Sequence, residues 1–218
     1  MTSAATTSCP VPAAVARVHS TRTIRADLGG NGRLEGARVV MVKGAPAQCR
    51  WFVVVSSGTR AISTPVPRAL LALGRPDLFG VVRLGADARR EIVVRANVDA
   101  NTEAFAVYAF ERSAVERIRV AVRGSRDLLY AGSGGALIAV GCLDGGGRHI
   151  VASDAVSNGA RVRVDRHMLK LAGDRLVQTS LHTLTNANLK LLPEFRGAQK
   201  RGIRGLAFSG CDLRVPGK

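Results

Sequence analysis

A serine surrounded by glycines is the residue of this chain whose setting most directly suggests chemistry. Residues 131–141 have the sequence AGSGGALIAVG, so Ser133 stands between glycines and leads into an apolar run. A serine hydroxyl acts as a nucleophile when a histidine removes its proton and a carboxylate orients that histidine. The same glycines also suit a tight turn that enters a buried strand. The rest of the sequence must supply a histidine and an acid for the catalytic interpretation to hold.

The stretch resembles the nucleophile loop of chymotrypsin-like serine proteases, in which Gly-x-Ser-Gly-Gly precedes a buried strand. That resemblance implies a histidine and then an acid ahead of the serine, but the only histidine there is His19, within a polar segment. Gly132 stands where that family usually carries an aspartate. The acid would have to lie between His19 and Ser133 in the chain. Candidates such as Asp77, Asp87 and Asp99 do not stand in a recognisable motif. We therefore expect a turn here. A chymotrypsin-like serine hydrolase is kept only as the second alternative to the function favoured below.

No other arrangement of residues predicts a metal site or a cofactor loop. The later histidines lack the spacing of zinc ligands: His149, His167 and His182. No glycine-rich stretch ends in the GK[ST] of a phosphate-binding loop. We expect no catalytic residue, no metal, no cofactor and no small-molecule substrate.

Charge is the strongest signal in the composition. The 218 residues include 32 lysines and arginines against 16 acids, a net charge of +16, and 27 of the basic residues are arginine. The net charge is +6 over residues 1–60, 0 over residues 61–116 and +10 over residues 117–218. A uniform compositional drift would not leave the middle neutral. We therefore expect surfaces from both ends of the chain to face a polyanion.

Alternation along two predicted strands places arginines on one face of each. Arginines 117, 119 and 123 alternate with Ile118, Val120 and Val122, and arginines 161 and 163 alternate with valines. An ordinary solvated face would mix in acids, and Asp165 is nearly the only one in register. The glycine-punctuated segment 196–205 and the N-terminal arginines add further charge. The predicted nucleic-acid-binding residues are Arg17, Arg22, Arg25, Arg117, Arg119, Arg123, Arg161, Arg163, Arg196, Lys200, Arg201 and Arg204.

Short apolar runs separated by turn residues predict a mainly β fold. Most runs have five to seven residues, are rich in β-branched or aromatic side chains, and end at Gly, Asp, Asn or Ser. We expect an antiparallel β-sandwich or barrel, jelly-roll-like, with one or two short helices and an extended N-terminal arm. The predicted strands are 37–43, 50–56, 79–84, 91–97, 104–110, 116–122, 136–142, 148–153, 160–164, 175–181, 187–192 and 203–208.

Two short helices and one boundary complete the predicted organisation. A helix is expected within 64–74, with Pro67 in its first turn, and another within 165–173, with Asp165 as N-cap and Gly173 as its end. Residues 1–34 lack any sustained periodicity and close on a glycine cluster, which predicts a flexible basic arm. Residues 35–218 are expected to form one β-rich globular domain.

The cysteines and the N-terminus indicate the compartment. The four cysteines lie far apart and form no CxxC pair, so we expect reduced, mostly buried thiols in a reducing compartment: Cys9, Cys49, Cys142 and Cys211. The N-terminus lacks the basic and apolar regions of a secretory signal. No window approaches the 18 apolar residues of a transmembrane helix. These features predict a virion or the cytoplasm, and no membrane partner.

Together these features favour a non-enzymatic structural protein that binds nucleic acid through phosphate contacts. We expect a small viral coat protein that self-assembles into a homo-oligomer or shell and packages a genome, with RNA favoured. The first alternative is a component of a ribosome or another ribonucleoprotein particle. Both interpretations require salt-dependent, weakly sequence-specific binding, because the chain carries no RNP, KH or zinc-finger motif.

Overall fold

The computed structural model describes residue 9 and residues 22–97, 99, 101–121, 127–133, 136–143, 149–158, 161–196 and 206–217. Strands dominate these residues, which confirms the mainly β prediction. The strands are β1 (Ile24–Ala26), β2 (Glu35–Met41), β3 (Trp51–Ser57), β4 (Arg60–Pro65), β5 (Asp77–Val82), β6 (Glu91–Asn97), β7 (Thr102–Glu111), β8 (Ala114–Ala121), β9 (Leu129–Ser133), β10 (Leu137–Leu143), β11 (His149–Asn158), β12 (Arg161–Ala172), β13 (Arg175–Leu184) and β14 (Ala207–Ser209). The helical elements are α1 (Arg68–Leu71) and the 3₁₀ turns η2 (Ala47–Cys49), η3 (Leu189–Leu191) and η4 (Pro193–Phe195).

Seven strands close into a mixed β-barrel. Around the ring the neighbours are β7, β9, β10, β11, β12, β13 and β8, and β8 returns to β7. Strands β9 to β13 follow one another as an antiparallel meander, and β13 then pairs in parallel with β8. Strands β6 and β5 continue the sheet beyond β7, and β14 pairs with β10. The predicted barrel is therefore confirmed, with one parallel pair completing its ring.

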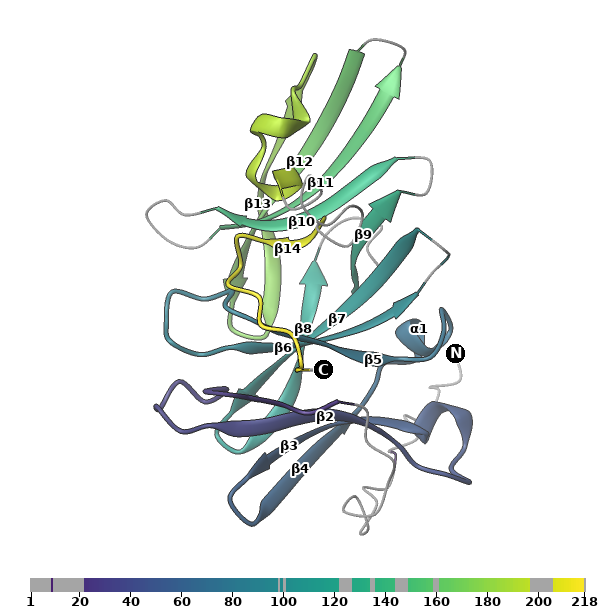
Figure 1. The fold of residues 1–218 in the computed structure, drawn as a ribbon, viewed down its shortest axis with the longest axis vertical. Helices are drawn as coiled ribbons and strands as arrows, with labels where there is room; N and C mark the ends of the chain where they lie inside the picture. Colours follow the sequence, from purple (N-terminus) through teal and green to yellow (C-terminus); the bar gives the residue numbers. More distant parts are fainter. Residues whose placement is uncertain are drawn as a thin grey trace, which may run out of the picture.

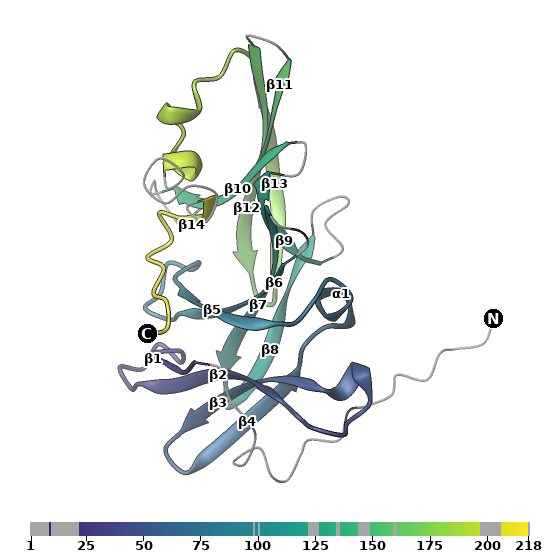
Figure 2. The same cartoon turned by 45° about the vertical axis from the view of Figure 1, so that its right-hand side comes forward.

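A second, four-stranded antiparallel sheet lies against the barrel sheet. Its order is β1-β2-β3-β4. Figures 1 and 2 show this sheet at one end of the molecule and the distal ends of β11 and β12 at the other. Strand β1, within the range expected to be a flexible arm, pairs with β2 from Ile24 opposite Ala37 to Ala26 opposite Glu35. The earlier part of the predicted arm lies outside the described residues, apart from Cys9.

Strand β7 separates two hydrophobic cores because successive side chains point to opposite faces. Phe105 and Val107 belong to the core of the barrel, whereas Ala106 and Tyr108 belong to the core beneath the four-stranded sheet. All four side chains are at most 1% exposed. A strand buried on both faces needs apolar residues at every position, which explains the sequence AFAVYAF.

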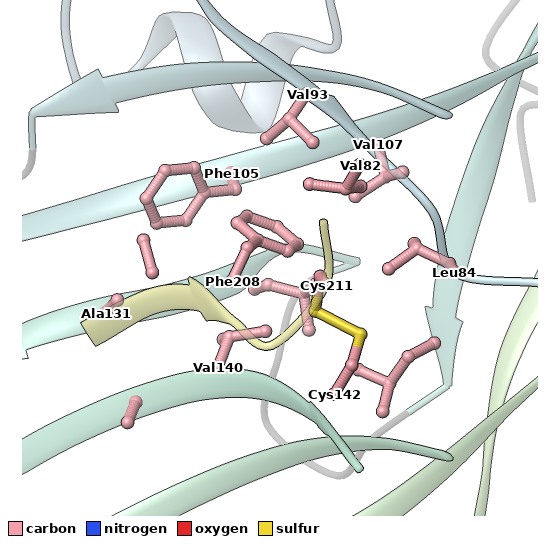
Figure 3. Close-up of a cluster of buried hydrophobic side chains, with 14 of the residues drawn as sticks. Val82, Leu84, Val93, Phe105, Val107, Ala131, Val140, Cys142, Phe208 and Cys211 are labelled. Atoms are coloured by element: carbon pink, nitrogen blue, oxygen red, sulfur yellow. A yellow bond between two sulfur atoms is a disulfide. The ribbon is translucent and has the colours of Figure 1, made fainter. Parts of the chain in front are cut away.

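Two disulfides correct the expectation of reduced thiols. Cys9 is bonded to Cys49, and Cys142 on β10 is bonded to Cys211 after β14. The second bond lies within the barrel core, near Phe208 (Figure 3). Partners 40 and 69 residues apart leave no spacing signal in the sequence, so only the fold could pair them. Disulfides form and persist in oxidising environments, so they argue against the predicted reducing compartment.

The helix predicted within 165–173 is wrong, because those residues form the second half of β12. Val164 and Leu169 lie on opposite faces of this strand, yet both are fully buried. The strand therefore buries one face in its first half and the other face in its second half. This change of buried face breaks the two-residue period, so no regular alternation marks these residues as a strand.

Two other predicted elements have clear outcomes. The strand predicted at 187–192 is wrong, because the Asn188 side chain accepts a hydrogen bond from the Lys190 backbone N–H at 3.1 Å and caps the turn η3. The helix predicted within 64–74 is confirmed as the single turn α1, which starts directly after Pro67. Sequence reasoning missed the short strands β1, β4 and β9.

Candidate polyanion-binding surface

The structure describes seven of the twelve residues predicted to bind nucleic acid. Arg22 precedes β1 and Arg25 lies on it, Arg117 and Arg119 lie on β8, and the remaining three are Arg161 and Arg163 on β12 and Arg196 after η4. The other five lie outside the described residues: Arg17, Arg123, Lys200, Arg201 and Arg204.

Strand β8 carries its arginines on one face, but the surroundings of that face change along the strand. Val115 is buried in the core beneath the four-stranded sheet, Arg117 is half-buried and Arg119 is exposed. The Arg117 guanidinium is 2.9 Å from the Asp127 carboxylate. Its charge is therefore compensated within the protein. On this strand, Arg119 is the predicted residue whose guanidinium is available to a ligand.

The parallel pairing of β8 with β13 places a second arginine beside Arg119. Arg175 is the direct register partner of Arg119, and the Arg119 backbone N–H donates to the Asp174 carbonyl at 2.8 Å. Arg175 is exposed and lies 3.8 Å from the Asp174 carboxylate. Sequence reasoning did not select Arg175, because no local pattern shows that strands 54 residues apart in the chain will be neighbours.

Strand β12 separates its two predicted arginines by their partners. Arg163 forms an ion pair with Asp165 at 3.0 Å, and Thr183 donates a hydrogen bond to the same carboxylate at 2.6 Å. The Thr183 hydroxyl and the Arg163 guanidinium hold the pKa of Asp165 below its usual value, with the hydroxyl as the larger cause. Arg161 is exposed and has no such partner among the described residues. It therefore remains free to contact an anion.

Five predicted arginines consequently combine exposure with an uncompensated charge in the described part of the chain: Arg22, Arg25, Arg119, Arg161 and Arg196. They lie on or beside β1, β8, β12 and η4, so the exposed positive charge is dispersed over both sheets. Guanidinium groups make bidentate hydrogen bonds to phosphate and keep their charge at any physiological pH. This arrangement suits dispersed contacts with the backbone of a long polyanion.

Ser133 is the last residue of β9 and pairs with Leu137 on β10, so Gly132 and Ser133 lie in a strand and not in the expected turn; residues 134 and 135 lie outside the described residues. Gly132 approaches the start of β7 so closely that a Cβ there would lie 2.1 Å from the Asn101 carbonyl oxygen. The Ser133 backbone N–H donates to that same carbonyl at 2.9 Å. The hollow beside the serine is lined by small and aliphatic residues: Ala136, Leu137, Ala155, Ser157, Val162 and Leu189. The Ser133 hydroxyl has no hydrogen-bond partner among the described residues.

Two of the three described histidines have partners, whereas the buried Nδ1 of His149 has no hydrogen-bond partner among the described residues. His167 Nδ1 lies 3.0 Å from the Gln178 amide oxygen, and its Nε2 lies 3.8 Å from the Asp154 carboxylate. His182 Nε2 lies 2.9 Å from the Ser180 hydroxyl. Within the described ranges, no group of three or more His, Cys, Asp or Glu side chains could hold a metal ion.

Among the residues that the structure places, no helix is both long and apolar enough to cross a membrane. No family model, curated protein or solved structure matches this chain. Any functional conclusion must therefore come from the residues themselves.

Proposed function

We propose that this chain is a non-enzymatic structural protein that binds a nucleic acid through its phosphates, with RNA favoured, and that it acts as a small self-assembling coat protein. The observation that supports this proposal is the set of five exposed arginines without a carboxylate partner among the described residues. A surface of this kind releases counterions from a polyanion on binding, which makes the affinity strongly dependent on salt.

The disulfides favour the coat protein over the ribonucleoprotein alternative. Ribosomes and similar particles work in reducing compartments, where disulfides are rare. The surface of a virion is an oxidising environment, in which bonds such as Cys9–Cys49 and Cys142–Cys211 persist. We therefore propose an extracellular or virion location for the folded protein.

A charge-matched pair of variants tests the binding proposal. The double variant Arg119→Gln/Arg161→Gln removes two proposed phosphate contacts, and Arg50→Gln/Arg68→Gln removes two exposed arginines that the sequence did not select. RNA binding is measured by fluorescence anisotropy between about 50 and 200 mM salt. We expect the first variant to bind more weakly, with the slope of log K against log[salt] reduced by about two. Equal losses in both variants, or binding that does not respond to salt, would contradict the proposal.

Assembly is tested separately on the unmodified protein. Size-exclusion chromatography and electron microscopy with and without RNA should show shells or large oligomers. A monomer that persists at high protein concentration in the presence of RNA would overturn the coat-protein proposal, even if RNA binding is retained.

A further inference from the structure

Three turns from the two sheets enclose a cavity of about 510 Å³. They are the β1–β2 loop and the β7–β8 turn, which contain Arg33 and Arg112, and the β3–β4 turn, directly after which Arg60 begins β4; all three arginines line the cavity. Arg89 also lines the cavity, together with Glu35 and Glu111. The charged lining therefore has a net formal charge of +2.

Both glutamates in the lining are already engaged. Glu35 is 1% exposed, and its carboxylate accepts hydrogen bonds from the Leu28 N–H at 2.9 Å and the Gly29 N–H at 3.4 Å. Glu111 forms an ion pair with Arg89. The two carboxylates thus have partners other than the three turn arginines.

The turn arginines are the uncompensated charges of the cavity. Arg33, Arg60 and Arg112 are exposed, and in the described part of the chain none of the three guanidinium groups has a carboxylate within ion-pair distance. Three positive charges around one cavity repel one another. An anion bound between them would offset this repulsion. Nothing in the described protein supplies that anion.

Local hydrogen bonds hold the longest of these turns in place. The Asp27 carboxylate accepts from the Asn31 N–H at 3.0 Å and the Gly32 N–H at 2.9 Å. The Asn31 side chain in turn accepts from the Arg33 N–H at 2.9 Å. A loop ordered in this way presents Arg33 without a large entropic cost on ligand binding.

The β7–β8 turn is equally defined. Arg112 and Ser113 have φ values of 46° and 67°, which are typical of the two-residue turns that match the twist of a hairpin.

Phe110 and Ile62 add apolar surface to the cavity lining, and Ser57 and Ser113 add hydroxyl groups. The cavity therefore offers charge for an anionic group and an apolar wall for an attached ring.

We propose that this cavity binds a small organic phosphate monoester, with the phosphate held by Arg33, Arg60 and Arg112 and the organic part against Phe110. A phosphate monoester carries close to two negative charges at neutral pH, which matches the lining charge of +2. Arginine binds phosphate through bidentate, charge-assisted hydrogen bonds. The volume lies within the range of small-ligand pockets. This site is independent of the proposed RNA-binding surface.

Isothermal titration calorimetry of the full chain with phenyl phosphate tests the site. We expect one molecule to bind per chain, and the double variant Arg60→Gln/Arg112→Asn to weaken binding at least tenfold. Asparagine tolerates the positive φ of position 112, so the turn should be kept. If that variant does not fold, Arg33→Gln/Arg60→Gln serves the same purpose. Arg50→Gln/Arg68→Gln is the charge-matched control and should bind as the unmodified protein does.

Titrations with inorganic phosphate and phenyl sulfate distinguish the possible ligands. Weaker binding of inorganic phosphate than of phenyl phosphate supports the apolar wall, and weaker binding of phenyl sulfate supports recognition of the dianion. Equal binding of the sulfate and phosphate esters overturns the preference for phosphate. Absence of phenyl phosphate binding at millimolar concentration, or binding unchanged in Arg60→Gln/Arg112→Asn, overturns the site. Because Arg119→Gln/Arg161→Gln should weaken RNA binding but leave phenyl phosphate binding unchanged, the two proposals can fail separately.

Discussion

Arg166 and Glu194 form a bidentate ion pair that joins β12 to η4. The Nε–Oε1 distance is 2.8 Å and the Nη2–Oε2 distance is 3.0 Å. Glu194 is fully buried, and its Oε1 also accepts a hydrogen bond from the Ser153 hydroxyl at 2.8 Å. The strand β12, the neighbouring β11 and the turn η4 are thus linked through one carboxylate.

Removal of one charge from this pair should be strongly destabilising. In Glu194→Gln the Arg166 guanidinium stays largely buried without a counter-charge, so we expect the free energy of unfolding to fall by about 3 kcal/mol. Urea denaturation measures the loss. Arg163→Gln is the control: it breaks an exposed pair with Asp165 and should cost under about 1 kcal/mol. Similar losses in the two variants would contradict a structural role for the buried pair.

The Cys142–Cys211 bond should contribute substantially to stability. It closes a loop with a sequence separation of 69, and a cross-link of that length lowers the entropy of the unfolded chain by the equivalent of about 4 kcal/mol. We expect Cys142→Ala/Cys211→Ala to unfold at correspondingly lower urea concentration under oxidising conditions. A thiol assay of the unmodified protein in denaturant should detect no free thiol from the four cysteines, and any titratable thiol would contradict the pairing.

Glu91 should make stability depend on pH. Burial raises the pKa of this carboxyl from 4.5 to about 7, against the opposing effects of the Leu84 N–H and the Arg89 guanidinium. The folded state therefore binds more protons than the unfolded state between these pKa values. The contribution of protonated Glu91 to the free energy of unfolding is fully present below about pH 4.5 and is lost as the pH rises through about 7. The free energy of unfolding should fall by about 3 kcal/mol over this range.

The variant Glu91→Gln isolates this contribution. A glutamine can still accept the Leu84 N–H hydrogen bond, which is 2.8 Å long, but does not titrate. Denaturation curves between pH 4.5 and 8 should show a smaller decline for the variant than for the unmodified protein. Parallel pH profiles would show that Glu91 does not titrate in this range.

Gly132 should tolerate no side chain. A Cβ there would lie 2.1 Å from the Asn101 carbonyl oxygen and 2.6 Å from Thr102 Cα, and the φ of 146° is unfavourable for other residues. We expect Gly132→Ala to lower the free energy of unfolding by more than about 2 kcal/mol. Gly44→Ala is the control, because its φ is also positive but no atom lies within 4 Å; it should cost about 1 kcal/mol. Equal costs would disprove the close approach.

The serine beside this glycine provides a separate prediction. Since the Ser133 hydroxyl has no partner among the described residues, Ser133→Ala should leave both the stability and RNA binding unchanged. Reaction of the unmodified protein with a fluorophosphonate probe, lost in Ser133→Ala, would instead establish a nucleophile.

The strands themselves could be predicted from the sequence because the signal is local. Alternation of side chains predicted β8 and its arginine face, and the apolar run 104–110 predicted the strand β7, whose burial on both faces only the structure shows. The same approach failed at β12, where the buried face changes between Val164 and Leu169. It also missed the partners that decide which arginines are free, such as Asp127 beside Arg117.

The sequence by itself determined a mainly β chain with a large excess of arginine, because composition and the two-residue period are properties of neighbouring positions. Only the tertiary structure decided the closure of the barrel through β13 and β8, the two disulfides and the cavity formed by Arg33, Arg60 and Arg112. Each of these depends on contacts between residues far apart in the chain. The packing of the two hydrophobic cores determines these contacts, and local sequence patterns do not predict that packing.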